Sequence, residues 1–244
     1  MKQRGLKIIK LLAMTLVPSG VFTAFYIASG WFWRGIPSLA LFCVVAVPTL
    51  FLFEMVVVLY ANKKEYGSYG VQIAFTENEK TVWWKTFFYG FLLFSFAGLM
   101  TVTIAPLENT LMAEAFQKIN SILPAYFDWN NFELMKQYSK GTLLFTSVLY
   151  IITNVFIGPI IEEIYFRGYL TSRLKDFGIA APILITIVFS LYHWWLPFNN
   201  VFRICAFTVA AVIAYRKKNI YITMVFHCLC NLFSSISFII TLWG

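Results

Sequence analysis

The residues that decide the fold read TLLFTSVLYIITNVFIGPII at positions 142–161, followed by EEIYFR at positions 162–167. The first stretch has 20 residues and no charged side chain. This is the length that a helix needs to cross the hydrocarbon core of a bilayer. The second stretch adds two acids and an arginine directly at its end. The sequence therefore predicts a membrane-spanning helix that runs into a charged cluster.

Apolar runs of similar length recur along the 244-residue chain. They lie at 8–29, 36–61, 86–106, 142–161, 178–198, 201–215 and 219–241. Hydrophobic residues make up 60% of the chain and charged residues only 12%, whereas about 25% of an ordinary soluble domain is charged. The mean hydropathy is +0.74. The sequence thus predicts an all-α, multispanning transmembrane helix bundle with about seven spans, in a range of six to eight.

Three of these expectations concern particular segments. The run 8–29 exceeds the apolar core of a cleaved signal peptide, so it is expected to stay as an anchor. The run 142–161 could continue through the following polar residues as one longer helix. The segment 107–141 is expected to contain an interfacial helix, because apolar residues recur there at helical spacing. These residues are Met112, Phe116, Ile119 and Leu123. We expect residues 1–141 and 142–244 to pack as one membrane domain.

The basic residues predict the orientation of the chain. The formal net charge is +8, but the 19 Lys and Arg residues are dispersed between apolar runs, so we expect a lipid bilayer and no nucleic acid as a partner. With a cytoplasmic N-terminus, 14 of the 19 lie on the cytoplasmic side, where basic residues are retained. The other five are Arg34, Lys118, Lys136, Lys140 and Arg203. We expect an integral membrane protein with its N-terminus inside, and the short loops favour a bacterial plasma membrane.

Ionisable side chains at membrane depth are costly, so each one needs an explanation. The candidates are Glu54, Glu162, Glu163, Arg167, His193 and His227. Helical spacing puts Glu163 and Arg167 at i and i+4, the favourable order for an ion pair. Glu162 then lies about 100° further round the helix. One acid is thus expected to be neutralised while its neighbour projects elsewhere, a pattern that separates catalytic from supporting roles.

Two further pairs also have i, i+4 spacing, which puts each pair on one helix face. These are Phe189 with His193, and His227 with Asn231. Pro159, just before the two acids, is expected to kink the helix and open it locally. Ser190 lies three residues before His193, but this spacing alone does not make a nucleophilic dyad.

The three motifs together resemble the CPBP family of intramembrane proteases, which includes the type II CAAX prenyl endopeptidases and the bacterial Abi proteins. The motifs are Glu162-Glu163-xxx-Arg167, Phe189-xxx-His193 and His227-xxx-Asn231, and Gly168 also fits. The resemblance covers about residues 142–235. One departure is that residues 202–224 lack the glycines often found before the last motif.

The resemblance implies a membrane endopeptidase of the CAAX protease type. Glu162 would activate water together with His193, and His227 and Asn231 would stabilise the oxyanion. The other two motif residues, Glu163 and Arg167, would support the site. The implied substrate is a membrane-associated protein or peptide, with or without a lipid modification, and residues 142–244 would be the catalytic helices.

Other functions stay open at this point. No cofactor is predicted, but Glu162, His193 and His227 could supply the two-His, one-carboxylate ligand set of catalytic zinc, although the chain has no HExxH motif. A bacteriocin-immunity factor or a proton-coupled transporter would also bury Glu and His in the membrane. Glu54 could join such a relay, but we expect a hydroxyl, a water or a basic side chain to satisfy it. Cys228 and Cys230 are expected to be small packing residues rather than metal ligands.

Overall fold

The computed structural model describes residues 2–244, with side chains from residue 5. The described chain is 81% helical and contains no strand. The prediction of an all-α bundle is therefore confirmed. The helices are α1 (Lys2–Phe32), α2 (Ser38–Ala46), α3 (Leu52–Tyr66), α4 (Trp83–Leu111), α5 (Ala113–Ile122), α6 (Phe132–Met135), α7 (Lys140–Tyr150), α8 (Gly158–Glu162), α9 (Thr171–Arg173), α10 (Ala180–Leu191), α11 (Asn200–Arg216) and α12 (Tyr221–Trp243).

Within residues 2–244, five helical stretches are long and apolar enough to cross a membrane. They are Gly5–Phe32, Ser38–Tyr66, Trp83–Leu111, Lys140–Arg173 and Tyr221–Trp243. The expected count of about seven is thus not confirmed. Of the two remaining apolar runs, 178–198 forms a helix only up to Leu191, and 201–215 forms the 17-residue α11. The chain between these two helices is irregular and ends at Asn199, whose φ of 58° is left-handed.

The fourth stretch is a single helix from Lys140 to Arg173, which confirms that the apolar run continues through the paired acids. It is not uniformly α-helical. Two wider π-helical segments, Ile151–Ile157 and Glu163–Leu170, flank the short α8. Such π segments inside α-helices occur frequently at functional sites. Pro159 lies in the first turn of α8, directly after the first π segment, so its missing N–H falls where the hydrogen-bond pattern already changes.

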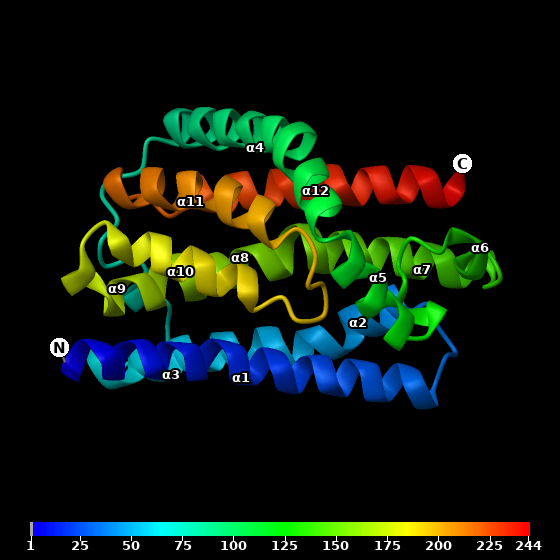
Figure 1. Cartoon of the computed structure of the whole chain (residues 1–244). Helices are drawn as coiled ribbons and strands as arrows, with labels where there is room; N and C mark the ends of the chain where they lie inside the picture. The colour runs from blue at the N-terminus through cyan, green and yellow to red at the C-terminus, as the bar shows by residue number, and fades with distance from the viewer. Residues whose placement is uncertain (1) are drawn as a thin grey trace.

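The helices are arranged in layers around this long helix (Figure 1). One outer layer holds α1 and α3, the middle holds α8 and α10, and α11 and α12 follow, with α4 packed on both of them from the far side. Gly90 permits this last contact, because a Cβ there would lie 2.5 Å from Val225 Cγ1. Helices from both halves of the chain therefore enclose the paired acids.

Small residues let α11 pack closely in the sixth apolar run. Ala206, Ala210 and Ala214 follow one another at i, i+4 spacing and are all buried. Small side chains allow helix backbones to approach each other in membranes. These alanines take the place of the glycines that this segment lacks.

The outer surface is strongly apolar, as expected for a protein surrounded by lipid. Helix α4 exposes large side chains along its length, including Trp84, Phe91 and Val102, each at least 60% exposed. Soluble monomers rarely expose an apolar surface of this extent. The surface therefore fits an integral membrane protein.

Ion pairs join the chain segments at one end of the bundle. Lys7 pairs with Asp176, Glu65 pairs with Arg173 at 2.8 Å, and Glu79 pairs with Lys218 at 3.0 Å. These lysines and arginines belong to the set that the sequence assigns to the cytoplasm. The structure thus gathers them at the end where α1 begins (Figure 1).

The segment after α4 also contains a helix, α5. No residue of α5 is buried, and Phe116 packs edge-to-face against Phe198, with the ring centroids 4.8 Å apart. The amphipathic spacing therefore does form a helix on the surface of the bundle.

Candidate active site

Glu162 and Glu163 stand at the junction between α8 and the second π segment, in the middle layer of the bundle. Both side chains are buried, with relative exposures of 5% and 0%. Two neighbouring acids at this depth are costly unless other groups compensate them. Their partners therefore define what each acid can do.

Glu163 is the paired acid. Its Oε1 lies 3.3 Å from a guanidinium nitrogen of Arg167, as the i, i+4 spacing predicts. The guanidinium in turn lies over the ring of Phe189, 4.0 Å from the centroid, which is a cation–π geometry. The first two sequence motifs thus meet through Arg167 and Phe189.

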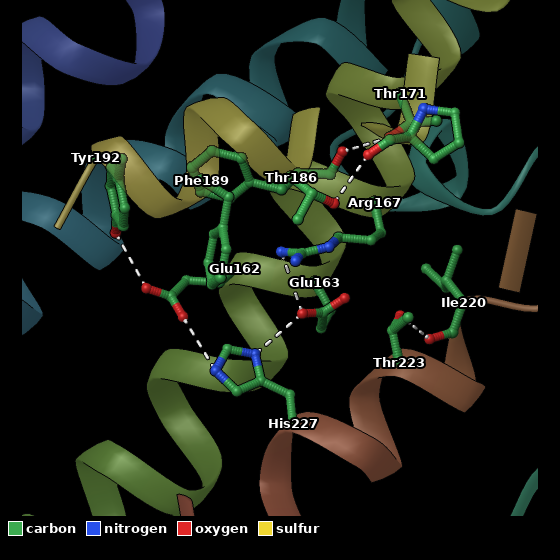
Figure 2. Close-up of polar contacts among 12 residues, drawn as sticks. Glu162, Glu163, Arg167, Thr171, Thr186, Phe189, Tyr192, Ile220, Thr223 and His227 are labelled. Carbon is green, nitrogen blue, oxygen red and sulfur yellow. Dashed lines mark hydrogen bonds and ion pairs between the residues drawn. The ribbon is translucent and has the colours of Figure 1, made fainter. Parts of the chain in front are cut away.

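His227 connects the two acids (Figure 2). Its Nδ1 lies 2.9 Å from Glu163 Oε1, and its Nε2 lies 3.8 Å from Glu162 Oε2. The first distance is a hydrogen bond, whereas the second is too long for one. The motif of α12 therefore contributes an imidazole that is fixed by Glu163 and faces Glu162.

His193 lies just beyond the end of α10, not within a helix as the i, i+4 reading implied. Its Nδ1 lies 2.7 Å from the carbonyl oxygen of Phe189, so Nδ1 donates and Nε2 keeps a lone pair. It also lines an open pocket of about 330 Å³. Among residues 5–244 no hydrogen bond joins His193 to Glu162, so the expected direct partnership has no contact to support it.

Asn231 lies one turn after His227 on α12 and is partly exposed. Its Nδ2 donates to the carbonyl oxygen of Asn154 at 2.8 Å, in the first π segment. The structure thus brings Asn231 to the same long helix that carries the acids. Its expected role at an oxyanion stays a prediction.

The paired acids and His227 lie in a part of the chain that matches a known protein family. The family model described as Type II CAAX prenyl endopeptidase Rce1-like matches residues 144–233. This part of the chain is an Rce1-like domain. It contains all six candidate residues, Glu162, Glu163, Arg167, His193, His227 and Asn231. No curated protein and no solved structure matches the chain.

The Rce1-like domain confirms the resemblance seen in the motifs. It indicates an intramembrane endopeptidase of the CAAX protease type with a membrane-associated protein as substrate. Together with the membrane-spanning helices, it indicates an integral membrane protein.

The sequence did not point to Tyr192, which belongs to the same site. Its side chain is 1% exposed, and its hydroxyl donates to Glu162 Oε1 at 3.1 Å (Figure 2). Its backbone carbonyl also accepts a hydrogen bond from Ser19 of α1. The one available signal was its position next to His193, because a buried tyrosine needs a partner for its hydroxyl.

Outside the Rce1-like domain, Glu54 of α3 also reaches this site. It is 1% exposed, and it lies beside Glu162 and the Tyr192 hydroxyl. Neither of its carboxyl oxygens has a hydrogen bond of normal geometry within the described residues. The expectation that a hydroxyl, a water or a basic side chain satisfies Glu54 stays a prediction, and the hydroxyl beside it is that of Tyr192.

A second polar cluster holds the segment that carries His193. Both carboxyl oxygens of Glu108, at the end of α4, accept backbone N–H groups at the start of α11, from Val201 at 3.1 Å and Phe202 at 2.8 Å. Arg203 donates to the carbonyl oxygens of Ser190 and Phe198 at 3.1 and 3.3 Å. No role was predicted for Glu108, and Arg203 was expected only as one of the non-cytoplasmic basic residues.

The described side chains do not converge as metal ligands. Across residues 5–244, no group of three or more His, Cys, Asp and Glu side chains is placed to hold a metal ion. The four cysteines are free, with Cys43 buried and Cys228 and Cys230 partly buried.

Proposed function

We propose that the chain is an intramembrane endopeptidase in which Glu162 is the general base that activates water. The observation that carries this proposal is the different environment of the two acids. Glu163 is neutralised by Arg167 and hydrogen-bonded to His227. Among the described residues, Glu162 receives a hydrogen bond on Oε1, from Tyr192, and none on Oε2, so its Oε2 can accept a proton. Buried neighbouring carboxylates with such different partners are typical of an acid–base assignment.

The gap between Glu162 Oε2 and His227 Nε2 suits a water molecule. At 3.8 Å these atoms are too far apart to bond directly but close enough for both to contact one water. Glu162 would take a proton from that water while the oxygen attacks the carbonyl carbon of the peptide bond. The C–N bond then breaks as Glu162 returns the proton to the leaving amine.

The developing oxyanion needs hydrogen-bond donors, and His227 and Asn231 are the proposed ones. The Nε2 of His227, 3.8 Å from Glu162 Oε2, would point toward the reacting centre. The amide of Asn231 donates to Asn154 at 2.8 Å, so a substrate oxygen would replace that carbonyl as the acceptor. His193, with a free lone pair on Nε2, is proposed to assist Glu162 once substrate and water are bound.

The decisive experiment is cleavage of a peptide library by the purified protein in detergent, read by mass spectrometry. Glu162→Gln is nearly isosteric, so folding should survive while cleavage falls by about 10²–10⁴-fold, the usual contribution of a positioned base. Glu114→Gln, at an exposed acid of α5, is the matched control and should keep full activity. Near-native turnover in folded Glu162→Gln would remove Glu162 from this role. A wild-type protein that cleaves no peptide would favour a non-catalytic membrane protein.

We further propose that the reaction needs no bound transition metal. Arg167 brings a positive charge close to the place where a cation would sit, and the amide of Asn231 is better suited to donating to an oxyanion than to binding zinc. Elemental analysis of active protein, combined with chelation and metal add-back, tests this. Stoichiometric zinc whose removal abolishes cleavage and whose return restores it would overturn the metal-free mechanism but not the protease.

The substrate and the topology are also proposals. Prenylated CAAX peptides and their unmodified counterparts should be compared in the same assay, because cleavage of only one set would decide whether the lipid is recognised. The proposed cytoplasmic N-terminus, in a bacterial plasma membrane, predicts that a cysteine introduced at Lys63 is labelled from the cytoplasm. A cysteine introduced at Lys136 should be labelled from the opposite side.

A further inference from the structure

Glu54 is the acid of this site that the proposed mechanism does not use. It comes from α3, so it lies outside the segment that matches the Rce1-like family. Its side chain is 1% exposed, and both carboxyl oxygens lack a hydrogen bond of normal geometry in the described structure. A buried polar group left in this state is unusual and calls for an explanation.

The hydroxyl groups near Glu54 have already given their protons to other acceptors. The phenol of Tyr192 lies next to the Glu54 carboxyl but donates to Glu162 Oε1 at 3.1 Å. The phenol of Tyr165 donates to the carbonyl oxygen of Met14 at 3.1 Å. A hydroxyl has one proton to give and two lone pairs that accept. Tyr192 can therefore serve Glu54 only as an acceptor.

The charges around Glu54 also disfavour its ionised form. The acid nearest to it is Glu162, a like charge. The guanidinium of Arg167 is already paired with Glu163, and the imidazole of His227 lies between Glu163 and Glu162. An ionised Glu54 would thus be a buried anion beside another anion, with neither a donor nor a cation of its own, which is very costly. A protonated, neutral Glu54 avoids the cost of a buried charge and has an O–H group that can donate a hydrogen bond.

We propose that neutral Glu54 is a positioning residue that donates its proton to the Tyr192 oxygen and so keeps the Tyr192 hydroxyl directed at Glu162. The result is a chain of two hydrogen bonds from Glu54 through Tyr192 to Glu162 Oε1. Hydrogen bonds in such chains strengthen one another at low dielectric. The chain fixes one oxygen of Glu162 and leaves Oε2 facing His227 and the water. This role rests on the proposed function of Glu162 as the base.

The substitutions at Glu54 distinguish a donor from a charge. In Glu54→Gln the amide can still donate to Tyr192, so kcat should stay within about threefold of wild type, which is less than one hydrogen bond is worth. Glu54→Met keeps a similar side-chain volume but removes the hydrogen-bond donor. We expect kcat to fall by about 10–100-fold, which is the effect of a misplaced catalytic group. KM should stay unchanged. Equal losses in both variants would overturn the proposal, as would wild-type activity in Glu54→Met.

Tyr192 supplies the coupling test. Tyr192→Phe removes the link, so the double variant Glu54→Met/Tyr192→Phe should be no slower than Tyr192→Phe alone. Groups that act through one another show such non-additivity. Two losses that multiply would mean that Glu54 does not act through Tyr192. The melting temperatures of all variants separate these effects on kcat from misfolding.

A readout independent of cleavage keeps the two proposals separate. Infrared spectroscopy of the purified protein at neutral pH should show the carbonyl band of a protonated carboxyl group, which Glu54→Gln removes and Glu162→Gln retains. A wild-type protein without this band would overturn the neutral Glu54 whatever the activity. A protein that has the band but cleaves no peptide would refute the endopeptidase and leave the neutral acid standing.

Discussion

The two polar clusters of the bundle differ in how well their buried groups are paired. Around Arg203 and Glu108, charged groups meet backbone partners: both Glu108 oxygens accept N–H groups, and Arg203 donates to two carbonyl oxygens. Around Glu162 the pairing is incomplete. Glu54, one oxygen of Glu163 and the guanidinium nitrogens of Arg167 have no hydrogen bond of normal geometry within the described residues.

This difference distinguishes a cluster that holds chain segments in place from a cluster that can take part in a reaction. A charged group that is fully hydrogen-bonded to backbone fixes the chain segments that it touches. Buried polar atoms without partners cost free energy, and native structures keep them mainly where a ligand, a water or a reaction uses them. We therefore assign the Glu108 and Arg203 cluster to holding the 192–199 segment, and the Glu162 cluster to the reaction.

The largest effect on stability is expected from Arg167→Ala. Removing Arg167 leaves Glu163 as a buried carboxylate without its cation, and breaking a buried pair in this way typically costs about 3–5 kcal/mol. Both the melting temperature in detergent and the cleavage rate should fall. Arg167→Lys, which keeps the charge but not the planar contact with Phe189, should lose less. If activity vanished while the melting curve stayed unchanged, Arg167 would have to contact the substrate or the transition state.

Glu108→Ala should have the next largest effect and should act on stability alone. It leaves two N–H groups at the start of α11 without an acceptor. Each buried donor without a partner costs about 1–3 kcal/mol, and relaxation of the structure recovers part of this, so the expected loss of stability is about 2–3 kcal/mol. Thermal unfolding measures the loss, and the cleavage rate of the folded fraction should stay near wild type. Glu114→Ala on exposed α5 is the control. Full stability together with lost activity would move Glu108 to the reacting cluster.

Arg173→Ala should have the smallest effect. Its ion pair with Glu65 is at 2.8 Å, but both side chains are close to half exposed. Exposed pairs contribute about 0.2–1 kcal/mol because water and salt screen them. The melting temperature should thus change little, and any change should shrink at high salt. A loss as large as that of Arg167→Ala would mean that exposure does not separate these two ion pairs.

The helical fold followed directly from the sequence, but the end of α10 did not. Apolar runs of bilayer length predicted every long helix, because in lipid all backbone groups must be satisfied within the helix. The run 178–198 was wrongly counted as a span, because aromatic residues extend the apolar sequence beyond Leu191, where the helix ends. Pro197 was the local sign of a break in the sequence, and the left-handed φ of Asn199 marks that break in the structure.

The site was predictable where its geometry is local and was missed where it depends on packing. The Glu163–Arg167 pair lies within one helical turn, so its spacing revealed it. The motif pattern identified His227 although it comes from another helix. Tyr192 and Glu54 reach Glu162 only because α3, α8 and the end of α10 pack together. No spacing rule along the chain contains that information.

The short length of α10 bears on the second reactant of a hydrolysis, which is water. Twelve helical residues span roughly 18 Å, whereas the hydrocarbon core is about 30 Å thick. The irregular chain that follows would then lie at membrane depth, where exposed backbone is tolerated only if protein or a water-filled cavity surrounds it. An open pocket of about 330 Å³ lies along this segment and is lined by His193, Trp194 and Asn200. A hydrolase inside a bilayer needs a supply of water, and the early end of α10 leaves an opening beside His193, one of the candidate site residues.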